Sequence, residues 1–327
     1  MTSKEKNEMR CEFTQCQAMV EERLNERFSA LSSTKKQSIE ITTQTEPDLP
    51  DSESELFPVD KMSHDMLLEA MGYSLFAGGK RIRAVICMKF CMAVGGAPEA
   101  ALDAACAIEM LHTYTLIHDD MPCMDNDDVR RGKPSNHIEY GEDIAMLAGD
   151  ALQAAAFETL LQSDLPPSAI VEMARVLAAA AGPNGICGGQ YLDLLSIGRQ
   201  LTMDELLKIN SMKTAALIVA SARIGVIAGN GSQEQMVAAI QYALALGLAF
   251  QIRDDVLDYT ATIEELGKPI GSDKENKKTT FASLLDVYAC EVIISEMTRK
   301  AIKALDEKFD DKGFFKWLAN LLAERKS

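Results

Sequence analysis

Residues 118–128 read HDDMPCMDNDD and hold five carboxylates within ten positions. Like charges at this density destabilise a folded chain unless something cationic lies among them. A second group of aspartates, DDVLD, follows far downstream at residues 254–258. Mg²⁺ takes oxygen ligands from a few carboxylates and from substrate phosphates. The two groups therefore predict a cavity in which they face each other and hold Mg²⁺ against a phosphorylated substrate.

The spacing of each group indicates its local geometry. Asp254, Asp255 and Asp258 stand at helical spacing, so they share one helix face. In the first group Pro122 disfavours a regular helix, and we expect the chain to bend there and bring Asp125 back towards Asp119. A Ca²⁺-binding EF-hand loop is excluded, because neither aspartate is followed by the required glycine at position six and glutamate at position twelve.

The composition predicts an all-α protein with a sizeable core. Hydrophobic residues make up 47% of the 327 residues and aromatic residues only 6%, and the commonest apolar types favour helices over strands. The net charge of -16 argues against a nucleic-acid-binding protein. Local basic motifs can still bind an anionic substrate.

The sequence shows no targeting or membrane signal. The first residues are polar and lack the apolar region of a signal peptide, and no uninterrupted apolar run reaches the roughly 18 residues of a membrane span. The eight cysteines include no CxxC pair, which indicates reduced thiols. We therefore expect a cytoplasmic protein without a membrane span.

The chain divides near residue 60. Residues 12–31 have the apolar spacing of an amphipathic helix, and residues 32–60 have the composition of a flexible acidic linker. Residues 1–60 are thus expected to be a helix with a linker, and residues 61–327 a single helical domain. No alternating strand pattern stands out in that domain.

Several helix boundaries can be read from the domain's sequence. Pro98 suits the first turn of a helix that runs to about His118. Capping boxes are expected at Thr202 and Ser232, and closing helices at about 280–308 and 313–325.

Basic and polar residues accompany the aspartates. GGKRIR at residues 78–83 places three cations at a helix start, where backbone amides already favour anions. Arg130 and Arg131 follow the first aspartate group directly, and Lys213-Thr214 lies within an otherwise apolar helix. His112 stands two helical turns before Asp119, and Gln251 stands one turn before Asp254, each on the aspartate face.

Together these motifs resemble the trans-prenyltransferases, the short-chain isoprenyl diphosphate synthases. The resemblance covers about residues 64–325 and includes, in order, GGKRIR (78–83), DDMPCMD (119–125), NDDVRRGKPSNH (126–137), GGQYLD (188–193), KT (213–214), FQIRDDVLD (250–258) and GKPIGSD…KKTT (267–280). It implies an all-α isoprenoid-synthase-type helical bundle around a central cavity, a homodimer, three Mg²⁺ ions, and isopentenyl diphosphate and allylic diphosphates as substrates.

The resemblance also implies a role for each matching residue. The metal ligands would be Asp119, Asp120 and Asp125 on one side and Asp254, Asp255 and Asp258 on the other. The allylic diphosphate would be held by Arg130, Lys213, Lys268 and Lys278. Isopentenyl diphosphate would be bound by Lys80, Arg83, His112 and Arg131. Thr214 and Gln251 would border the reacting carbons, and together with Lys213 they would be the catalytic residues.

Product length is expected to depend on Tyr114 and its neighbour Thr115. In this family an aromatic residue five positions before the first aspartate stops the chain at farnesyl, whereas a small residue or Met allows geranylgeranyl. Tyr114 therefore favours farnesyl diphosphate, with geranylgeranyl diphosphate as the alternative. On an ideal helix, however, Tyr114 does not share the face of Asp119.

Two rival hypotheses remain. A class I terpene cyclase would share the helical fold, but it would not need a second DDxxD or GGKRIR. A non-catalytic partner subunit of a heteromeric synthase would be expected to lack one aspartate motif, and both are complete here.

Overall fold

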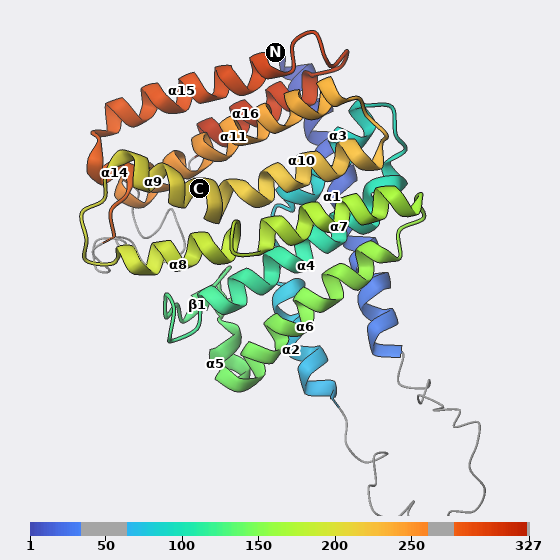
Figure 1. The fold of residues 1–327 in the computed structure, drawn as a ribbon, viewed down its shortest axis with the longest axis vertical. Helices are drawn as coiled ribbons and strands as arrows, with labels where there is room; N and C mark the ends of the chain where they lie inside the picture. The colour runs from blue at the N-terminus through green and yellow to red at the C-terminus, as the bar shows by residue number, and fades with distance from the viewer. Residues whose placement is uncertain (34–63, 261–277, 326–327) are drawn as a thin grey trace, which may run out of the picture.

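The structure, a computed structural model, describes residues 1–33, 64–260 and 278–325. Helices make up most of the described chain, and the only strands there are two of two residues each. The predicted all-α fold is confirmed (Figure 1). The elements are α1 (Ser3–Ser33), α2 (Asp65–Leu75), α3 (Ile82–Ala93), the 3-10 turn η3 (Pro98–Ala101), α4 (Leu102–Asp119), β1 (Val129–Arg130), β2 (Lys133–Pro134), α5 (Asn136–Tyr140), α6 (Glu142–Leu161), α7 (Pro167–Ala181), α8 (Ile186–Ser196), α9 (Met203–Asn210), the π turn η4 (Ser211–Ala215), α10 (Ala216–Ala228), α11 (Gln233–Thr260), α14 (Phe281–Leu284), α15 (Val287–Ala304) and α16 (Gly313–Glu324).

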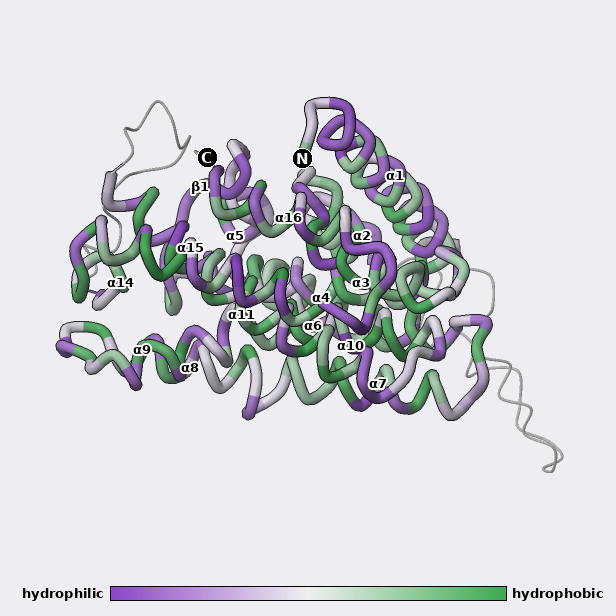
Figure 2. The backbone as a smooth tube through the Cα atoms, turned by 90° about the horizontal axis from the view of Figure 1, so that it is seen from above, coloured by the Kyte–Doolittle hydropathy of each residue, from purple (hydrophilic) through white to green (hydrophobic). Residues whose placement is uncertain are grey.

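Helix α4 lies at the centre of the bundle. Its apolar residues are spread around the whole helix, and a helix of that kind is stable only when other elements enclose it. Helices α3 and α6 pack along it, and α10 and α11 continue the stack towards α15 (Figure 1). Seen from above, hydrophobic segments gather around α4, α6 and α10, whereas α1 at the edge carries many hydrophilic residues (Figure 2).

Helix α1 shares the main core with the rest of the bundle. It contributes Cys16, Val20 and Leu24, which are at most 4% exposed. The helix predicted from residue 12 begins earlier, at Ser3. Most of the predicted linker lies outside the described residues, and the domain boundary near residue 60 stays a prediction.

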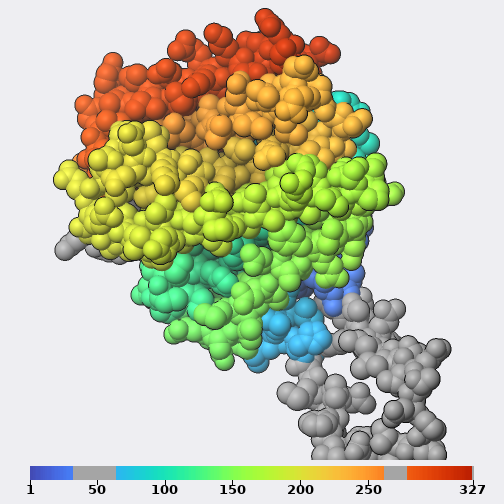
Figure 3. Space-filling model, in the orientation of Figure 1, coloured from blue at the N-terminus to red at the C-terminus, as the bar shows by residue number. Residues whose placement is uncertain are grey.

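A smaller hydrophobic cluster joins α9, α11, α14 and α15. Its members include Leu206, Ile209, Val256 and Phe281. In the space-filling view the yellow segment that contains α8 and α9 forms one side of the molecule, below the red C-terminal helices (Figure 3). This cluster supports one wall of the cavity described below.

Most of the predicted helix boundaries agree with the structure. The helix expected from Pro98 starts as η3 and continues as α4 to Asp119. The capping box at Thr202 is present, and Ser232 and Gln235 cap α11 reciprocally. The predicted helix over 280–308 is interrupted, because the side chain of Asp286 caps a new helix by accepting from Ala289 N.

The sequence did not reveal the β1–β2 hairpin. Each strand has only two residues, too few for an alternating pattern to show. The two strands are joined by Arg131 and Gly132, which have φ angles of 54° and 75°. Positive φ at both turn residues suits a tight hairpin. The hairpin places Arg130 against Asp120 and Asp127, and Arg131 against the carbonyl of Gly78.

Within the described part of the chain, three helical segments are long and apolar enough, by length and composition alone, to cross a membrane. They are Glu142–Leu161, Met203–Ala228 and Gln233–Thr260, and 44%, 56% and 50% of their apolar windows are buried inside the protein. The absence of a membrane span therefore stays a prediction.

Candidate active site

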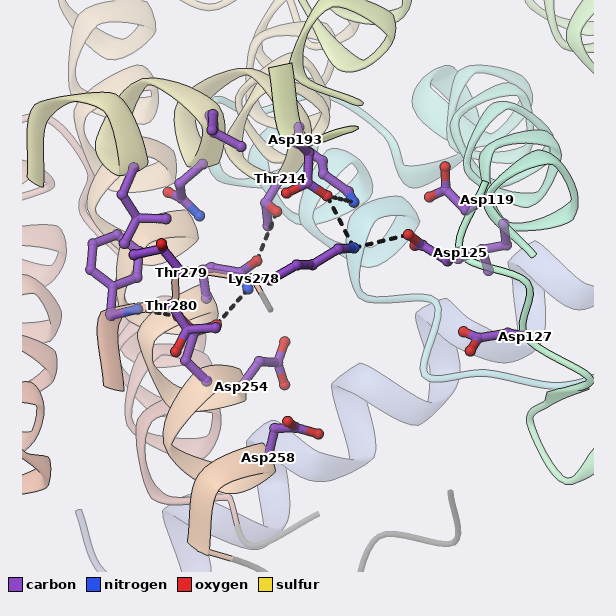
Figure 4. A pocket seen from close by; sticks show the side chains of 18 of the residues that line it. Asp119, Asp125, Asp127, Asp193, Thr214, Asp254, Asp258, Lys278, Thr279 and Thr280 are labelled. Atoms are coloured by element: carbon purple, nitrogen blue, oxygen red, sulfur yellow. Dashed lines mark hydrogen bonds and ion pairs between the residues drawn. The ribbon is translucent and has the colours of Figure 1, made fainter. Parts of the chain in front are cut away.

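The two aspartate groups line opposite sides of one cavity of about 350 Å³. Asp119 and Asp125 approach it from the end of α4, and Asp254 and Asp258 from α11 (Figure 4). Thr214 and Asp193 lie above, and Lys278 extends across the space between the two groups. The cavity wall also includes the apolar side chains of Leu116, Leu206, Ile209 and Phe281.

The first aspartate group folds back on itself as predicted. Helix α4 ends at Asp119, and Asp125 N donates to the backbone carbonyl of Asp119 at 2.9 Å. Both carboxylates therefore reach the cavity although six positions separate them. Burial raises the pKa of Asp119 to about 6, and Asp125 adds to the rise while Lys213 opposes it.

Asp120 has different surroundings from Asp119 and Asp125. It is 2% exposed, does not line this cavity, and accepts from Arg130 Nε at 2.9 and 3.2 Å. Arg130 also donates to Asp127 at 3.0 Å. Asp120 therefore orients Arg130 towards the cavity, and this geometry favours a positioning role for Asp120 over that of a metal ligand.

The second aspartate group lines the cavity with all three of its carboxylates, Asp254, Asp255 and Asp258. Asp255 is only 7% exposed, and it accepts from Phe281 N at 2.7 Å. Asp255 thus ties α11 to the start of α14. Arg325, which the sequence analysis missed, donates to Asp254. Its guanidinium lies 3.9 Å from the ring centroid of Phe250.

Asp193 is a further site residue that the sequence analysis did not assign. Its Oδ2 lies 2.7 Å from Lys213 Nζ and 3.4 Å from Lys278 Nζ. Lys278 Nζ also donates to Asp125 at 2.9 Å. Burial alone would raise the pKa of Asp193, but the two lysines hold it below its ordinary value. The available signal was its place at the end of GGQYLD.

Lys213 and Thr214 lie in the π turn η4, a feature that often marks functional positions in helices. Helix α8 packs so closely on this turn that a Cβ at Gly189 would come within 2.3 Å of Lys213 N. Only glycine allows this approach. The close packing fixes Lys213 beside Asp193.

A hydrogen-bonded chain connects Thr214 to α14. Thr214 Oγ1 donates to Gln251 Oε1 at 2.8 Å, and Gln251 Nε2 donates to Asp255 Oδ1 at 2.9 Å. Both Thr214 and Gln251 line the cavity. The carboxylate of Asp255 thereby fixes the orientation of the Gln251 amide, and the amide oxygen faces Thr214.

The remaining predicted cations form a second cluster. Arg83 Nη1 lies 3.4 Å from His112 Nε2, and Arg131 donates to the carbonyl of Gly78 in the same loop as exposed Lys80. Burial and the neighbouring Arg83 lower the pKa of His112 well below its ordinary value. This crowding of positive charge suits a second anionic ligand. Lys268 lies outside the described residues.

The two residues predicted to set product length are buried in α4. Tyr114 is 5% exposed, and its ring packs edge-on against His118 at 5.6 Å between centroids. Its hydroxyl lies 3.5 Å from Cys187 Sγ on α8. Thr115 is 8% exposed and donates to His112 O. Neither side chain lines the cavity in the described chain.

Comparison with known proteins identifies the family. The family model for polyprenyl synthetase matches residues 64–321. The chain belongs to the polyprenyl synthetase family. It is therefore a prenyltransferase, as the motifs implied.

Two relatives of this chain are named for different products. The chloroplastic geranylgeranyl pyrophosphate synthase of Capsicum annuum is 46% identical over 247 residues, which cover 75% of this chain and 67% of the relative. The farnesyl diphosphate synthase of Geobacillus stearothermophilus is 42% identical over 262 residues, with 79% and 88% covered.

Solved structures agree with this assignment. The apo structure of an FPP/GFPP synthase from Zymomonas mobilis matches with a TM-score of 0.79 at 29% identity, covering 97% of this chain and 99% of the other. A geranylgeranyl pyrophosphate synthetase from Pyrococcus horikoshii matches with a TM-score of 0.78 at 30% identity, covering 98% and 99%.

The variant Asp119→Asn is predicted to stabilise the metal-free protein and to lower its turnover. Because the folded-state pKa of about 6 exceeds the ordinary 3.8, the folded protein loses stability as pH rises through that interval. A neutral amide avoids this loss. At pH 7.5 we expect a free energy of unfolding higher by up to about 3 kcal/mol and turnover lower by about 1,000-fold or more.

Thermal unfolding in EDTA and a steady-state assay check this prediction. The stability difference should shrink as the pH is lowered towards 4, because in the folded protein the aspartate is then uncharged like the asparagine. Asp150→Asn, at a side chain that is 64% exposed on α6, serves as the control and should change neither quantity. A lower melting temperature for Asp119→Asn at pH 7.5 would contradict the account.

Proposed function

We propose that this chain condenses isopentenyl diphosphate head-to-tail with dimethylallyl and geranyl diphosphate in a Mg²⁺-dependent reaction, with farnesyl diphosphate as the main product. The observation that carries the proposal is the pair of opposed aspartate groups on one cavity, with lysines between them and a second cation cluster nearby. Carboxylates suit Mg²⁺, and the cations suit two diphosphates.

The donor set fits Mg²⁺ held jointly with substrate. Among residues 1–33, 64–260 and 278–325, no group of three or more His, Cys, Asp or Glu side chains forms a complete metal site. Mg²⁺ is usually held by one or two carboxylates together with substrate phosphates. Asp119 and Asp125 on one side, and Asp254 and Asp258 on the other, meet that requirement, and we propose three ions.

Bound Mg²⁺ would neutralise the negative charge that develops on the departing diphosphate. The chain's own residues would do the rest of the electrostatic work. Lys213, Lys278 and Arg130 would hold the allylic diphosphate from the cavity wall. Lys80, Arg83, His112 and Arg131 would hold isopentenyl diphosphate in the second cluster.

Ionisation of the allylic diphosphate leaves an allylic cation that must be protected from water. The oxygens of Thr214 and Gln251 would stabilise it by their dipoles, and the apolar side chains of the cavity would exclude water. The double bond of isopentenyl diphosphate then attacks the cation. The proton lost afterwards can pass to the departing diphosphate, so the reaction needs no strong side-chain base.

The length of the main product is the second part of the proposal. Tyr114 supports farnesyl diphosphate, while the relatives include synthases named for the farnesyl and the geranylgeranyl product. Because Tyr114 packs between α4 and α8 outside the cavity lining, its ring would act as a floor that a growing chain meets beyond Leu116. The homodimer and the cytoplasmic location stay predictions from the sequence.

Incubation of the purified protein with isopentenyl diphosphate and dimethylallyl or geranyl diphosphate tests the activity. With Mg²⁺ we expect chain elongation and a farnesyl product by chromatography, and with EDTA none. Elongation without a divalent cation would overturn the proposed metal dependence, and no elongation under any condition would overturn the activity. A geranylgeranyl main product would overturn the argument from Tyr114.

Tyr114→Ala should lengthen the main product from C15 to C20, because truncating the ring opens space below the cavity. The matched control is Tyr114→Phe, which loses the contact with Cys187 Sγ but keeps the bulk of the ring, and it should still give C15. If Tyr114→Ala keeps a C15 product while it turns over, another residue forms the floor.

A further inference from the structure

The loop that carries GGKRIR has a strained backbone. Gly78 and Gly79 have φ angles of 87° and 135°, and Arg81 has a φ of 48° in the left-handed region. A residue with a side chain adopts that region only when its surroundings hold it there. The contacts around Arg81 therefore identify what fixes the loop.

The side chain of Arg81 points inward, away from solvent. It is 1% exposed, and Nε donates to Glu21 Oε1 of α1 at 2.7 Å. Its other nitrogens lie 3.3 Å from Glu21 Oε2, 3.4 Å from Glu109 Oε2 of α4, and 2.6 Å from the carbonyl of Leu75. Of the three cations in the motif, Arg81 is thus the internal anchor, held by α1, α2 and α4.

Helix α1 holds the same loop at a second point. Gln17 Nε2 donates to the carbonyl of Gly79 at 3.0 Å, and Arg131 donates to the carbonyl of Gly78. Helix α1 packs against both α3 and α4, and its Gln17 and Glu21, one helical turn apart, reach Gly79 and Arg81. Glu109 completes the arrangement, because Oε1 accepts from Ala84 N at 3.2 Å in the first turn of α3.

The cations that this loop presents repel one another. Arg83 lies against His112, and its buried Nε has no hydrogen-bond partner among the described residues. Glu109 supplies negative charge from beneath, since it touches both Arg81 and the start of α3. Such a cluster keeps its geometry without an anion only if the backbone that carries it is fixed.

We propose that Glu21 and Gln17 of α1 are positioning residues for isopentenyl diphosphate. Glu21 holds Arg81 inward, Gln17 holds Gly79, and together they fix the loop so that Arg83 faces His112 and Arg131. The proposal rests on the proposed function of this cluster. Helix α1, which the sequence motifs do not include, is then part of the site for isopentenyl diphosphate. It has no role in the site for the allylic diphosphate.

Helix α1 is docked independently of this loop. Arg27 donates to both oxygens of Asp103 at 2.8 and 2.6 Å, and Glu12 accepts from buried Lys89 at 2.6 Å. Removal of the Glu21 carboxylate therefore leaves other ion pairs that hold α1 in place. This independence allows a positioning effect to be separated from a docking effect.

The test compares Glu21→Ala, Glu21→Gln and Gln17→Ala with two controls on the same helix. Arg27→Ala breaks an ion pair of α1 that does not touch the loop, and Glu26→Ala removes a carboxylate that is 58% exposed. For each protein, calorimetry gives the Kd of isopentenyl diphosphate, kinetics give kcat and both KM values, and circular dichroism gives the melting temperature.

We expect Glu21→Ala to raise the Kd and the KM of isopentenyl diphosphate about 10-fold, which corresponds to about 1.4 kcal/mol. The kcat value and the KM of the allylic diphosphate should change less than about 2-fold. Glu21→Gln, which keeps one acceptor oxygen, should lie between Glu21→Ala and the unaltered protein. Gln17→Ala should show the same selectivity with a smaller rise.

Three outcomes would overturn the inference. They are an unchanged Kd in Glu21→Ala, an equal rise in both KM values, and an equal Kd rise in Arg27→Ala at a similar melting temperature. The last would mean that only docking of α1 matters. Failure of the proposed function is distinguishable, because the unaltered protein would then neither bind isopentenyl diphosphate nor elongate a chain.

Discussion

The excess of negative charge around one cavity is the constraint on which the rest of the site depends. Among the described residues, seven aspartates and three basic residues line the cavity, and like charges so close together destabilise one another. Lys278 reduces this cost by bridging Asp125 and Asp193, and Arg325 does the same for Asp254. The negative charge that remains attracts divalent cations to the cavity, and the lysines allow the cavity to bind diphosphate.

Helix packing fixes this charge distribution. The α4 helix ends where the first aspartate group begins, and a π turn with a glycine beside it places Lys213 against Asp193. The chain from Thr214 through Gln251 to Asp255 fixes polar oxygens at the apolar part of the wall. Oriented dipoles need little reorganisation when charge develops, which is the usual source of electrostatic catalysis. The fold thus prepares the site before any substrate arrives.

Much of this arrangement could be predicted from the sequence, because it depends on local rules. Pro122 predicted the end of the helix, and helical spacing predicted that Asp254 and Asp258 share a face. The partners could not be predicted, since Arg325 reaches Asp254 and Lys278 reaches Asp125 only through the tertiary fold. For the same reason, the motif GGKRIR did not reveal which of its cations turns inward. The β1–β2 hairpin could not be predicted, because strands of two residues are too short to show an alternating pattern.

The most direct test of the account is a calorimetric titration with inorganic pyrophosphate, with and without Mg²⁺. We assign one diphosphate to the cation cluster at Arg83, which needs no metal, and another to the aspartate cavity, which does. We therefore predict one binding site in EDTA and a second site that appears only with Mg²⁺ and is lost in the double variant of Asp119→Asn and Asp254→Asn. The same number of sites with and without Mg²⁺ would contradict the account.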